Sequence, residues 1–402
     1  MASPHAQFFQ LDSTITFLNH GSFGACPRPV LDFQQRLRER MEREPVRFFL
    51  RDLEPLLDEA RADLARLVGA QSDDLAFVTN ATTGVNAVLR SVSLAPGDEL
   101  LTTDHAYNAC ANALEFAASR AGAQVVVARV PFPIRDPGEV TAAITARASD
   151  RTRLALVDHV TSPTGLVFPV ADIVRELDRR GIDTLVDGAH ATGMLPLSLD
   201  AIGAAYYTGN CHKWLCAPKG AGFLHVRRDR QKAIRPTVIS HGANSPRGDR
   251  SRFRVEFDWT GTADPTAFLS VPAAIRWLSE ILPGGLEAVM ARNHALALDA
   301  RNVLGRALGV TAPAPDAMLG SLAALPLPDG AGEAPRTPLF SDPLQEALYE
   351  EFRIQVPVVP WPAPPRRLIR VSAQLYNDLA EYEDLADALV TLLGHPRPNS
   401  QI

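Results

Sequence analysis

The sequence predicts an α/β protein with a mainly parallel sheet and a smaller second domain. The chain has 402 residues, more than one simple hydrophobic core usually organises. In the middle of the chain, short and continuously apolar segments alternate with segments of helical periodicity, which is typical of a parallel sheet covered on both faces by helices. After about residue 265 the pattern changes to longer helical segments and a proline-rich stretch, which indicates a separate C-terminal unit.

The first predicted element is a helical region over residues 27–67. Arg, Glu and Leu recur there at helical spacing, and the pattern is interrupted at Pro45 and Pro55, because proline removes a hydrogen bond from a helix. The alternating region then begins with a strand at 75–79, a turn and a helix at 84–93. It continues with strands at 125–130, 154–159, 184–186 and 204–208 and with helices at 140–148 and 170–180.

The C-terminal part is predicted to hold long helices at 266–282 and 285–308, the proline-rich stretch 313–338, and a strand followed by a helix over 368–393. We therefore divide the chain into a large domain of residues 21–265 and a small domain of residues 266–402. An N-terminal segment of residues 1–20 is expected to pack beside the small domain.

Composition excludes several classes of function. The formal net charge is -6, so there is no global basic field for nucleic acid or anionic lipid. No apolar run reaches roughly 18 residues, so no membrane span is expected. The N-terminal residues have neither a basic nor an apolar region of the kind found in signal peptides. The four cysteines form no CxxC pair, which fits a reduced cytoplasmic protein without a disulfide framework or a metal site.

Lysine is rare in this chain, and one lysine stands out. Of 40 basic residues only three are lysine. Lys213 follows an apolar strand, where its amine is expected to face the crevice and burial is expected to lower its pKa. Lys219 lies in Pro-Lys-Gly and Lys232 in a charged run, so both are poorer candidates. An exposed turn lysine remains the alternative, but a buried lysine matches the Schiff-base lysine that pyridoxal 5'-phosphate (PLP) requires.

Three further requirements of PLP have candidates at strand ends. Asp187 ends a strand and could pair with the pyridine nitrogen, the alternative being a helix N-cap. His190 and Ser162 could reach the phenolic oxygen, the alternatives being a core histidine and a turn serine. His105 follows another strand-like segment and could stack on the ring, with Tyr107 as the second choice.

The phosphate of PLP has a candidate site in Asn80-Ala-Thr-Thr-Gly, which follows the first core strand and opens a helix. Backbone N–H groups and a hydroxyl at a helix N-terminus form an anion site. Thr82 is the predicted phosphate ligand, with Ala81 and Thr83 contributing. An ordinary N-cap is the alternative, because threonine is common there.

With these residues assembled, the chain resembles the class V aminotransferase family of fold-type I PLP enzymes, and within it the isopenicillin N epimerase-like branch. The markers of this resemblance are Phe17-Leu-Asn-His-Gly-Ser-Phe-Gly, Asn80-Ala-Thr-Thr-Gly, His159-Val-Thr-Ser-Pro-Thr-Gly, Val186-Asp-Gly-Ala-His, Gly209-Asn-Cys-His-Lys-Trp, Trp259-Thr-Gly-Thr-Ala-Asp-Pro-Thr and Arg370-Val-Ser-Ala-Gln-Leu-Tyr-Asn. It implies a large domain with a mainly parallel, seven-stranded sheet covered by helices, and a smaller α+β C-terminal domain.

The resemblance also implies roles for individual residues. The catalytic set is Lys213, Asp187 and His190. Further residues are implied to bind the cofactor or the substrate: Asn210 and His212 the phosphate, Thr262 the phosphate of the neighbouring subunit in a homodimer with active sites at the interface, Arg370 the substrate carboxylate, and Asn19 and His20 the wall of the substrate pocket.

The predicted function is that of a PLP enzyme acting on an amino-acid-like substrate through a Cα carbanion. An epimerase is favoured, with a carbon–sulfur β-elimination lyase as the alternative and an aminotransferase less favoured. The stretch 356–367 lacks the loop cysteine that desulfurases of this family carry, which disfavours that chemistry. A non-catalytic binding protein is disfavoured by Lys213, Asp187 and Arg370. The second proton donor that an epimerase needs is not assigned.

Overall fold

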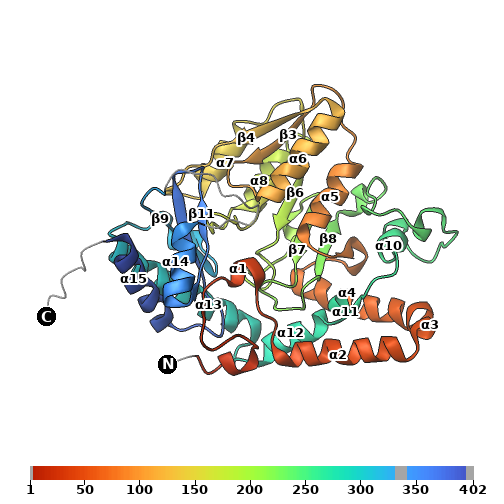
Figure 1. Ribbon diagram of the computed structural model, residues 1–402. Helices are drawn as coiled ribbons and strands as arrows, with labels where there is room; N and C mark the ends of the chain where they lie inside the picture. Colours follow the sequence, from red (N-terminus) through yellow and green to blue (C-terminus); the bar gives the residue numbers. More distant parts are fainter. Residues whose placement is uncertain (1–2, 331–341, 395–402) are drawn as a thin grey trace.

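A seven-stranded sheet forms the centre of the protein (Figure 1). The computed structural model describes residues 3–330 and 342–394. The strand order is β2-β8-β7-β6-β5-β3-β4, and all neighbours are parallel except β8, which runs antiparallel to β2 and β7. The predicted mainly parallel, seven-stranded sheet is therefore confirmed. Its strands are β2 (Leu75–Val78), β3 (Glu99–Thr103), β4 (Gln124–Ala128), β5 (Thr152–Asp158), β6 (Asp183–Gly188), β7 (Tyr206–Asn210) and β8 (Gly222–Val226).

Helices cover both faces of this sheet because its strands are apolar on both sides. Along β5, Leu154 and Leu156 pack into one core, while Ala155 and Val157 pack into the other. The first core contains side chains of α5 (Ala81–Ser91), α6 (Asn108–Ala121) and α10 (Arg252–Phe257), and the second contains side chains of α4 (Leu53–Val68), α7 (Gly138–Thr145) and α8 (Val170–Asp178).

The predicted helical region at 27–67 is present, but it is interrupted at one place only. α2 (Arg28–Arg43) ends before Pro45, which begins the short α3 (Pro45–Arg47). A π-helical segment, Phe48–Asp52, then leads directly into α4. Pro55 lies in the first turn of α4 and the chain stays helical through it, so the interruption expected at Pro55 is wrong.

The C-terminal part forms a second, smaller layer of sheet and helices. β9 (Leu322–Leu327), β11 (Val358–Pro360) and β12 (Arg367–Ser372) make an antiparallel sheet in the order β11-β12-β9. β9 lies inside the proline-rich stretch, where no strand was expected, and residues 331–338 of that stretch fall outside the described residues. The helices of this layer are α13 (Gly285–Leu308), α14 (Pro343–Phe352) and α15 (Leu379–Leu393), whereas α11 (Thr266–Leu269) and α12 (Val271–Glu280) pack against α2 and α4.

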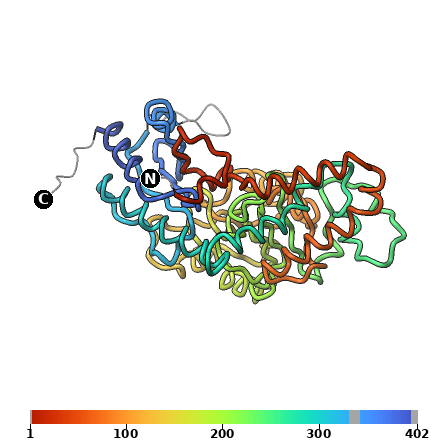
Figure 2. The backbone as a smooth tube through the Cα atoms, turned by 90° about the horizontal axis from the view of Figure 1, so that it is seen from below, coloured from red at the N-terminus to blue at the C-terminus, as the bar shows by residue number. Residues whose placement is uncertain are grey.

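The two ends of the chain meet at this smaller layer. β1 (Thr16–Phe17) pairs in parallel with β10 (Ile354–Gln355), and Figure 2 shows the red N-terminal segment beside the blue C-terminal ones. Tyr376, close to α15, packs against Phe9 and Phe17. The first residues of the chain are therefore held against the C-terminal part before the chain enters α2.

Two properties of the described residues bear on function. No helix within 3–330 and 342–394 is both long and apolar enough to cross a membrane. All four cysteines lie in the described part, and each is buried with a free thiol.

Candidate active site

A cavity of about 340 Å³ opens beyond the carboxyl ends of β5, β6 and β7. These strand ends supply Asp158, Asp187 and Asn210 to its wall. Ser22 and Phe23 come from α1 (His20–Phe23), which lies between the C-terminal helices and the large sheet in Figure 1. Because ligands bind at this edge of open parallel sheets, the cavity is the candidate active site.

Lys213 lines this cavity from the turn that follows β7. Its Nζ atom lies 3.1 Å from Nε2 of His190. Burial lowers the pKa of Lys213 to about 8, although the Asp187 carboxylate acts in the opposite direction. Near pH 8 much of the amine is therefore neutral, which is the form that can act as a nucleophile or a base.

His190 contacts a partner on each side of its ring. Nδ1 accepts a hydrogen bond from the indole Nε1 of Trp214 at 3.3 Å, and Nε2 faces Lys213. Burial lowers the pKa of His190 well below its usual value, and the neighbouring Lys213 charge lowers it further. The imidazole is therefore neutral at physiological pH.

Two carboxyl groups lie side by side in the cavity wall. Asp158 and Asp187 are register partners on β5 and β6, and both are buried. The Asp187 carboxylate accepts from the backbone N–H of Ala189 at 2.9 Å and from the thiol of Cys110 at 3.2 Å. Burial, followed by the charge of Asp187, raises the pKa of Asp158 well above its usual value. Asp158 is thus a protonated neighbour of Asp187, because two buried carboxylates so close together cannot both ionise.

The N-terminus of α5 forms another part of the wall, through Asn80, Ala81 and Thr82. Asn80 caps this helix by accepting a hydrogen bond from the backbone N–H of Thr83 at 2.9 Å. The Thr83 hydroxyl is bonded to Thr79 and Asn80 and lines a neighbouring cavity instead. At Gly84 a Cβ would clash with the Thr208 hydroxyl, so glycine lets the start of α5 approach β7 closely.

Asn210 and His212 also face this helix terminus, but each is partly engaged by backbone. Asn210 Oδ1 accepts from the Ala81 N–H at 2.8 Å. His212 Nδ1 donates to the Ala221 carbonyl at 2.7 Å, which leaves Nε2 for the cavity. Burial lowers the pKa of His212 to about 4. A phosphate beside Nε2 would favour its protonation, because an anion stabilises the charged imidazole.

Arg370 lies behind Ser22 and Ser162, which both line the cavity. Its two terminal nitrogens donate to the Ser162 oxygens and, at 2.9 Å, to the Ser22 hydroxyl. Its Nε atom is buried without a partner among the described residues. Burial lowers the pKa of Arg370 to about 10, so it stays cationic at neutral pH. A carboxylate entering the cavity offers this cation the charged partner that two hydroxyls do not.

His105 lies outside the cavity, and Tyr107 lines it instead. The buried His105 ring bonds to Thr164 Oγ1 at 2.8 Å and to the Val130 carbonyl at 3.1 Å. These two partners hold the ring in the core, so His105 does not face the cavity as expected for a stacking residue, whereas the second choice, Tyr107, does line the cavity.

Asn19 and His20 do not line the cavity either, contrary to expectation. His20 is completely buried at the start of α1, with Nδ1 bonded to Tyr376 at 2.8 Å and Nε2 bonded to the Lys213 carbonyl at 3.0 Å. Its ring therefore supports the backbone of Lys213 from behind. The following turn of α1 carries Ser22 to the cavity in its place.

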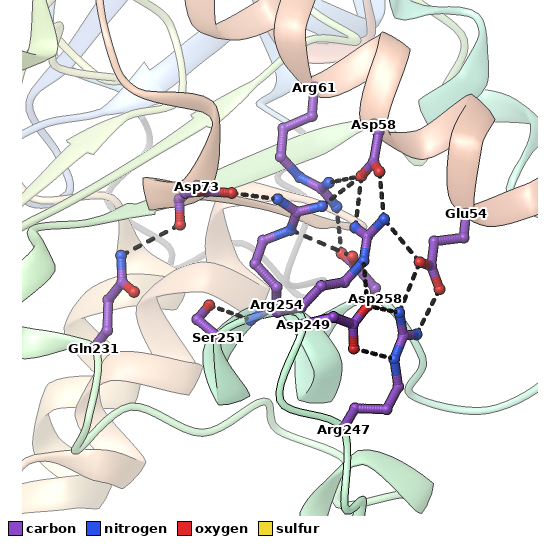
Figure 3. A network of polar contacts seen from close by, with 11 residues as sticks. Glu54, Asp58, Arg61, Asp73, Gln231, Arg247, Asp249, Ser251, Arg254 and Asp258 are labelled. Atoms are coloured by element: carbon purple, nitrogen blue, oxygen red, sulfur yellow. Dashed lines mark hydrogen bonds and ion pairs between the residues drawn. The ribbon is translucent and has the colours of Figure 1, made fainter.

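Thr262 is exposed on a loop away from this cavity. The loop follows Asp258, which is bonded to the buried guanidinium groups of Arg61 and Arg254. Both arginines also contact Asp58 on α4, within the network of ion pairs drawn in Figure 3. The charged network thus anchors the start of the loop, and the role of Thr262 in a neighbouring subunit stays a prediction.

Several residues at the site were not found from the sequence: Ser22, Cys110, Asp158 and Trp214. A signal existed for Asp158, since it ends a buried strand just as Asp187 does. The contacts of the other three join segments distant in sequence, which spacing alone does not reveal.

The chain is similar to a known protein family and to two proteins that share one name. The family model "Aminotransferase class-V" matches residues 33–334. Isopenicillin N epimerase of Streptomyces clavuligerus is 38% identical over 398 residues, covering 96% of each chain. The protein of the same name from Amycolatopsis lactamdurans is 40% identical over 396 residues, covering 95% of this chain and 96% of the relative.

A second group of relatives carries a different name. A probable chloroplastic L-cysteine desulfhydrase of Arabidopsis thaliana is 30% identical over 409 residues, covering 96% of this chain and 84% of the relative. Among solved structures, C-DES with glycine covalently linked to its PLP cofactor superposes with a TM-score of 0.78 at 23% identity, covering 96% of this chain and 99% of C-DES. That structural match supports the fold.

Proposed function

The chain belongs to the aminotransferase class-V family, and from this premise we propose that it is a PLP-dependent epimerase acting at the Cα atom of an amino-acid substrate. One observation carries the proposal. The amine of Lys213, with a pKa lowered to about 8, shares a cavity with Asp187 and with the N-terminus of α5. The full-length similarity to isopenicillin N epimerases supports epimerisation as the reaction.

The residues of the cavity fit PLP. Asp187 would hold the pyridine nitrogen, and the buried Asp158–Asp187 pair supports this because a cationic ring nitrogen would offset the cost of a buried carboxylate. Tyr107 would lie against the ring, and Ser162 or His190 would reach the phenolic oxygen.

The phosphate would lie at the start of α5, where the helix dipole favours an anion. Ala81 and Thr82 would bind it, with Asn210 and His212 beside them. Thr83 points elsewhere, so its contribution is limited to the capped first turn. Thr262 of a second subunit would complete this phosphate site.

Two residues would carry the removal of the proton and the binding of the substrate. The cofactor, when bound, supplies an electron sink for the charge left at Cα by a departing proton. Lys213 holds and moves that proton, because its amine is partly neutral at working pH. Arg370 would orient the substrate by binding the substrate's carboxylate through two hydrogen bonds. These would replace the hydrogen bonds that Arg370 now donates to Ser22 and Ser162.

A carbon–sulfur lyase is the second candidate, supported by the similarity to L-cysteine desulfhydrases. It needs one base, which Lys213 supplies, whereas an epimerase needs a second proton donor. Transamination is less favoured. Cysteine-based desulfuration is disfavoured, since all four thiols are buried.

We further propose a cytoplasmic homodimer. Exposed apolar side chains support a subunit interface: Phe23 on α1, Val46 on α3, Leu50 in the π-helical segment, and Val238 and Ile239, of which Val238 lines one cavity with Thr260 and Gly261 of the Thr262 loop. Four unpaired cysteines support a reducing compartment. Sedimentation of the purified protein tests the dimer, and a monomer at micromolar concentration would contradict it.

The reaction is tested by incubating the PLP-loaded protein with a panel of L-amino acids in D₂O. An epimerase yields the D-enantiomer with deuterium at Cα. Release of pyruvate and ammonia instead would identify the lyase. If the protein shows no cofactor absorbance after PLP is added, the enzyme proposal fails and a binding protein of this fold is supported.

A further inference from the structure

Trp214 is almost completely buried next to Lys213 and has no part in the chemistry described so far. Its side chain is 1% exposed and packs beside His20, with ring centroids 4.9 Å apart. Its only polar group, the indole N–H, is directed at Nδ1 of His190 at 3.3 Å. An indole nitrogen can only donate a hydrogen bond, so Nδ1 of His190 must be an acceptor and carry no proton.

This contact determines where the proton of His190 lies. A neutral imidazole carries one N–H, and since Nδ1 is an acceptor, the proton resides on Nε2. Nε2 lies 3.1 Å from Nζ of Lys213, so the imidazole presents a donor to the amine. A neutral amine can accept that hydrogen bond, whereas an ammonium group has no lone pair with which to accept it.

We propose that Trp214 is a positioning residue that sets the tautomer of His190 and thereby keeps the amine of Lys213 in its neutral, reactive form. The importance for catalysis rests on the proposed function, but the tautomer itself is a property of the protein alone. Without the indole N–H, the proton of His190 can move to Nδ1. Nε2 then accepts a hydrogen bond from the Lys213 ammonium, which stabilises the charged amine and raises its pKa.

Other titratable groups also face Lys213, from four elements. The Asp187 carboxylate on β6 raises the pKa of Lys213 and the Arg370 guanidinium on β12 lowers it, while Asp158 on β5 and the Cys110 thiol on α6 carry no charge as long as they keep their protons. The Lys213 and Arg370 charges, together with His20, act on His190 in turn. Replacing Trp214 by phenylalanine changes none of these groups and retains an aromatic ring in the same apolar surroundings. A shift in this variant therefore reports on the single lost N–H.

The tautomer can be measured on the cofactor-free protein by ¹⁵N NMR of labelled histidine, with the His190 signals assigned by their loss in His190→Gln. The expected wild-type state has the proton on Nε2, and Trp214→Phe moves part or all of it to Nδ1. A wild-type His190 with its proton on Nδ1 would overturn the proposal, whether or not the variant folds.

The amine is measured by the rate at which cofactor-free protein captures added PLP as a function of pH. In Trp214→Phe the midpoint of this profile is expected to rise by about 1 pH unit, the effect of reversing one hydrogen bond. In a His190→Phe background no ring nitrogen remains that could change its tautomer, so adding Trp214→Phe should shift nothing. An equal shift in both backgrounds would assign Trp214 a purely structural role and reject the proposal.

Trp277→Phe is the matched control. It makes the same substitution on α12, where the ring packs edge-on against Phe8 and Phe9. Both the His190 tautomer and the pH midpoint should stay as in the wild type. Failure to bind PLP at all would remove the proposed function but leave the NMR result standing, so the two outcomes are distinguishable.

Discussion

Asp158 and Asp187 stand opposite each other at the ends of neighbouring parallel strands and share one buried edge of the cavity. Their closeness gives them different roles. Asp187 takes the charge that the cofactor ring would neutralise, and Asp158 keeps its proton because burial and Asp187 raise its pKa. The pair thus provides one negative charge to the site instead of two.

Replacing Asp158 by asparagine should stabilise the cofactor-free protein at neutral pH. The folded-state pKa of Asp158 is raised, so its protonated form is favoured in the native state. The stabilising contribution of the protonated Asp158 carboxyl is complete below the pKa of about 4 that this group has in the unfolded chain. It is lost as the pH rises through the higher pKa that the group has in the folded protein. Asparagine mimics the protonated form at every pH. Urea unfolding should therefore show a gain for Asp158→Asn over wild type that is larger at pH 8 than at pH 5.

The exposed Glu287→Gln serves as the control and should show no such divergence between pH 5 and pH 8. Equal stability of Asp158→Asn and wild type at both pH values would mean that Asp158 is ionised in the folded protein.

Replacing Lys213 by alanine should reduce turnover by at least about 10³-fold, since the base and the cofactor attachment are lost together. Lys232→Ala, at an exposed position, is the matched lysine control and should retain wild-type rates. Steady-state kinetics with the best substrate of the panel measures both variants. Full activity in Lys213→Ala would reject the central assignment.

Replacing Arg370 by lysine should raise KM more than it lowers kcat. A lysine keeps the positive charge but cannot form the bidentate contact, so kcat/KM is expected to fall by about 10- to 100-fold. Arg367 lies on the same strand, and its partner is Asp342. The control variant Arg367→Lys should therefore leave KM unchanged. An unchanged KM in Arg370→Lys would place the substrate carboxylate elsewhere.

Substitutions of His105 and of Tyr107 should affect different properties, the first the stability of the protein and the second its affinity for PLP. His105→Ala leaves the Val130 carbonyl without the His105 ring as its partner and the buried Thr164 hydroxyl with Thr161 alone, and should lower the free energy of unfolding by about 2 kcal/mol while PLP affinity is maintained. Tyr107→Ala should weaken PLP binding with little change in stability, because this side chain is 43% exposed in the cavity wall. Urea unfolding and fluorescence titration with PLP measure the two quantities, and the reverse pattern would restore His105 as the stacking residue.

The sequence predicted most of the central sheet because its parallel strands are short, continuous apolar runs. β8 was missed, since Gly222–Val226 is a strand by virtue of antiparallel pairing with β2 and β7, which come from distant parts of the chain. α6, which supplies Cys110 to the site, was missed as well.

Within the site, Asp187 and Lys213 could be placed because Asp187 lies at the end of one strand and Lys213 follows another, and the carboxyl ends of these two strands meet at one edge. His105 was chosen over Tyr107 from the sequence, and the cavity does not support that choice, because the position of the His105 ring depends on long-range partners. Thr164 and Val130 decide that choice, and neither is close to His105 in sequence.

The ion pairs around Asp258 have a consequence for inheritance. Under the proposed dimer, the loop held by Arg61 and Arg254 serves the active site of the other chain. A substitution that frees this loop would damage the partner's cofactor site while leaving the mutant's own Lys213 intact. In cells that express this form together with a Lys213→Ala form, each mixed dimer would therefore contain one intact site, and the two alleles would complement each other.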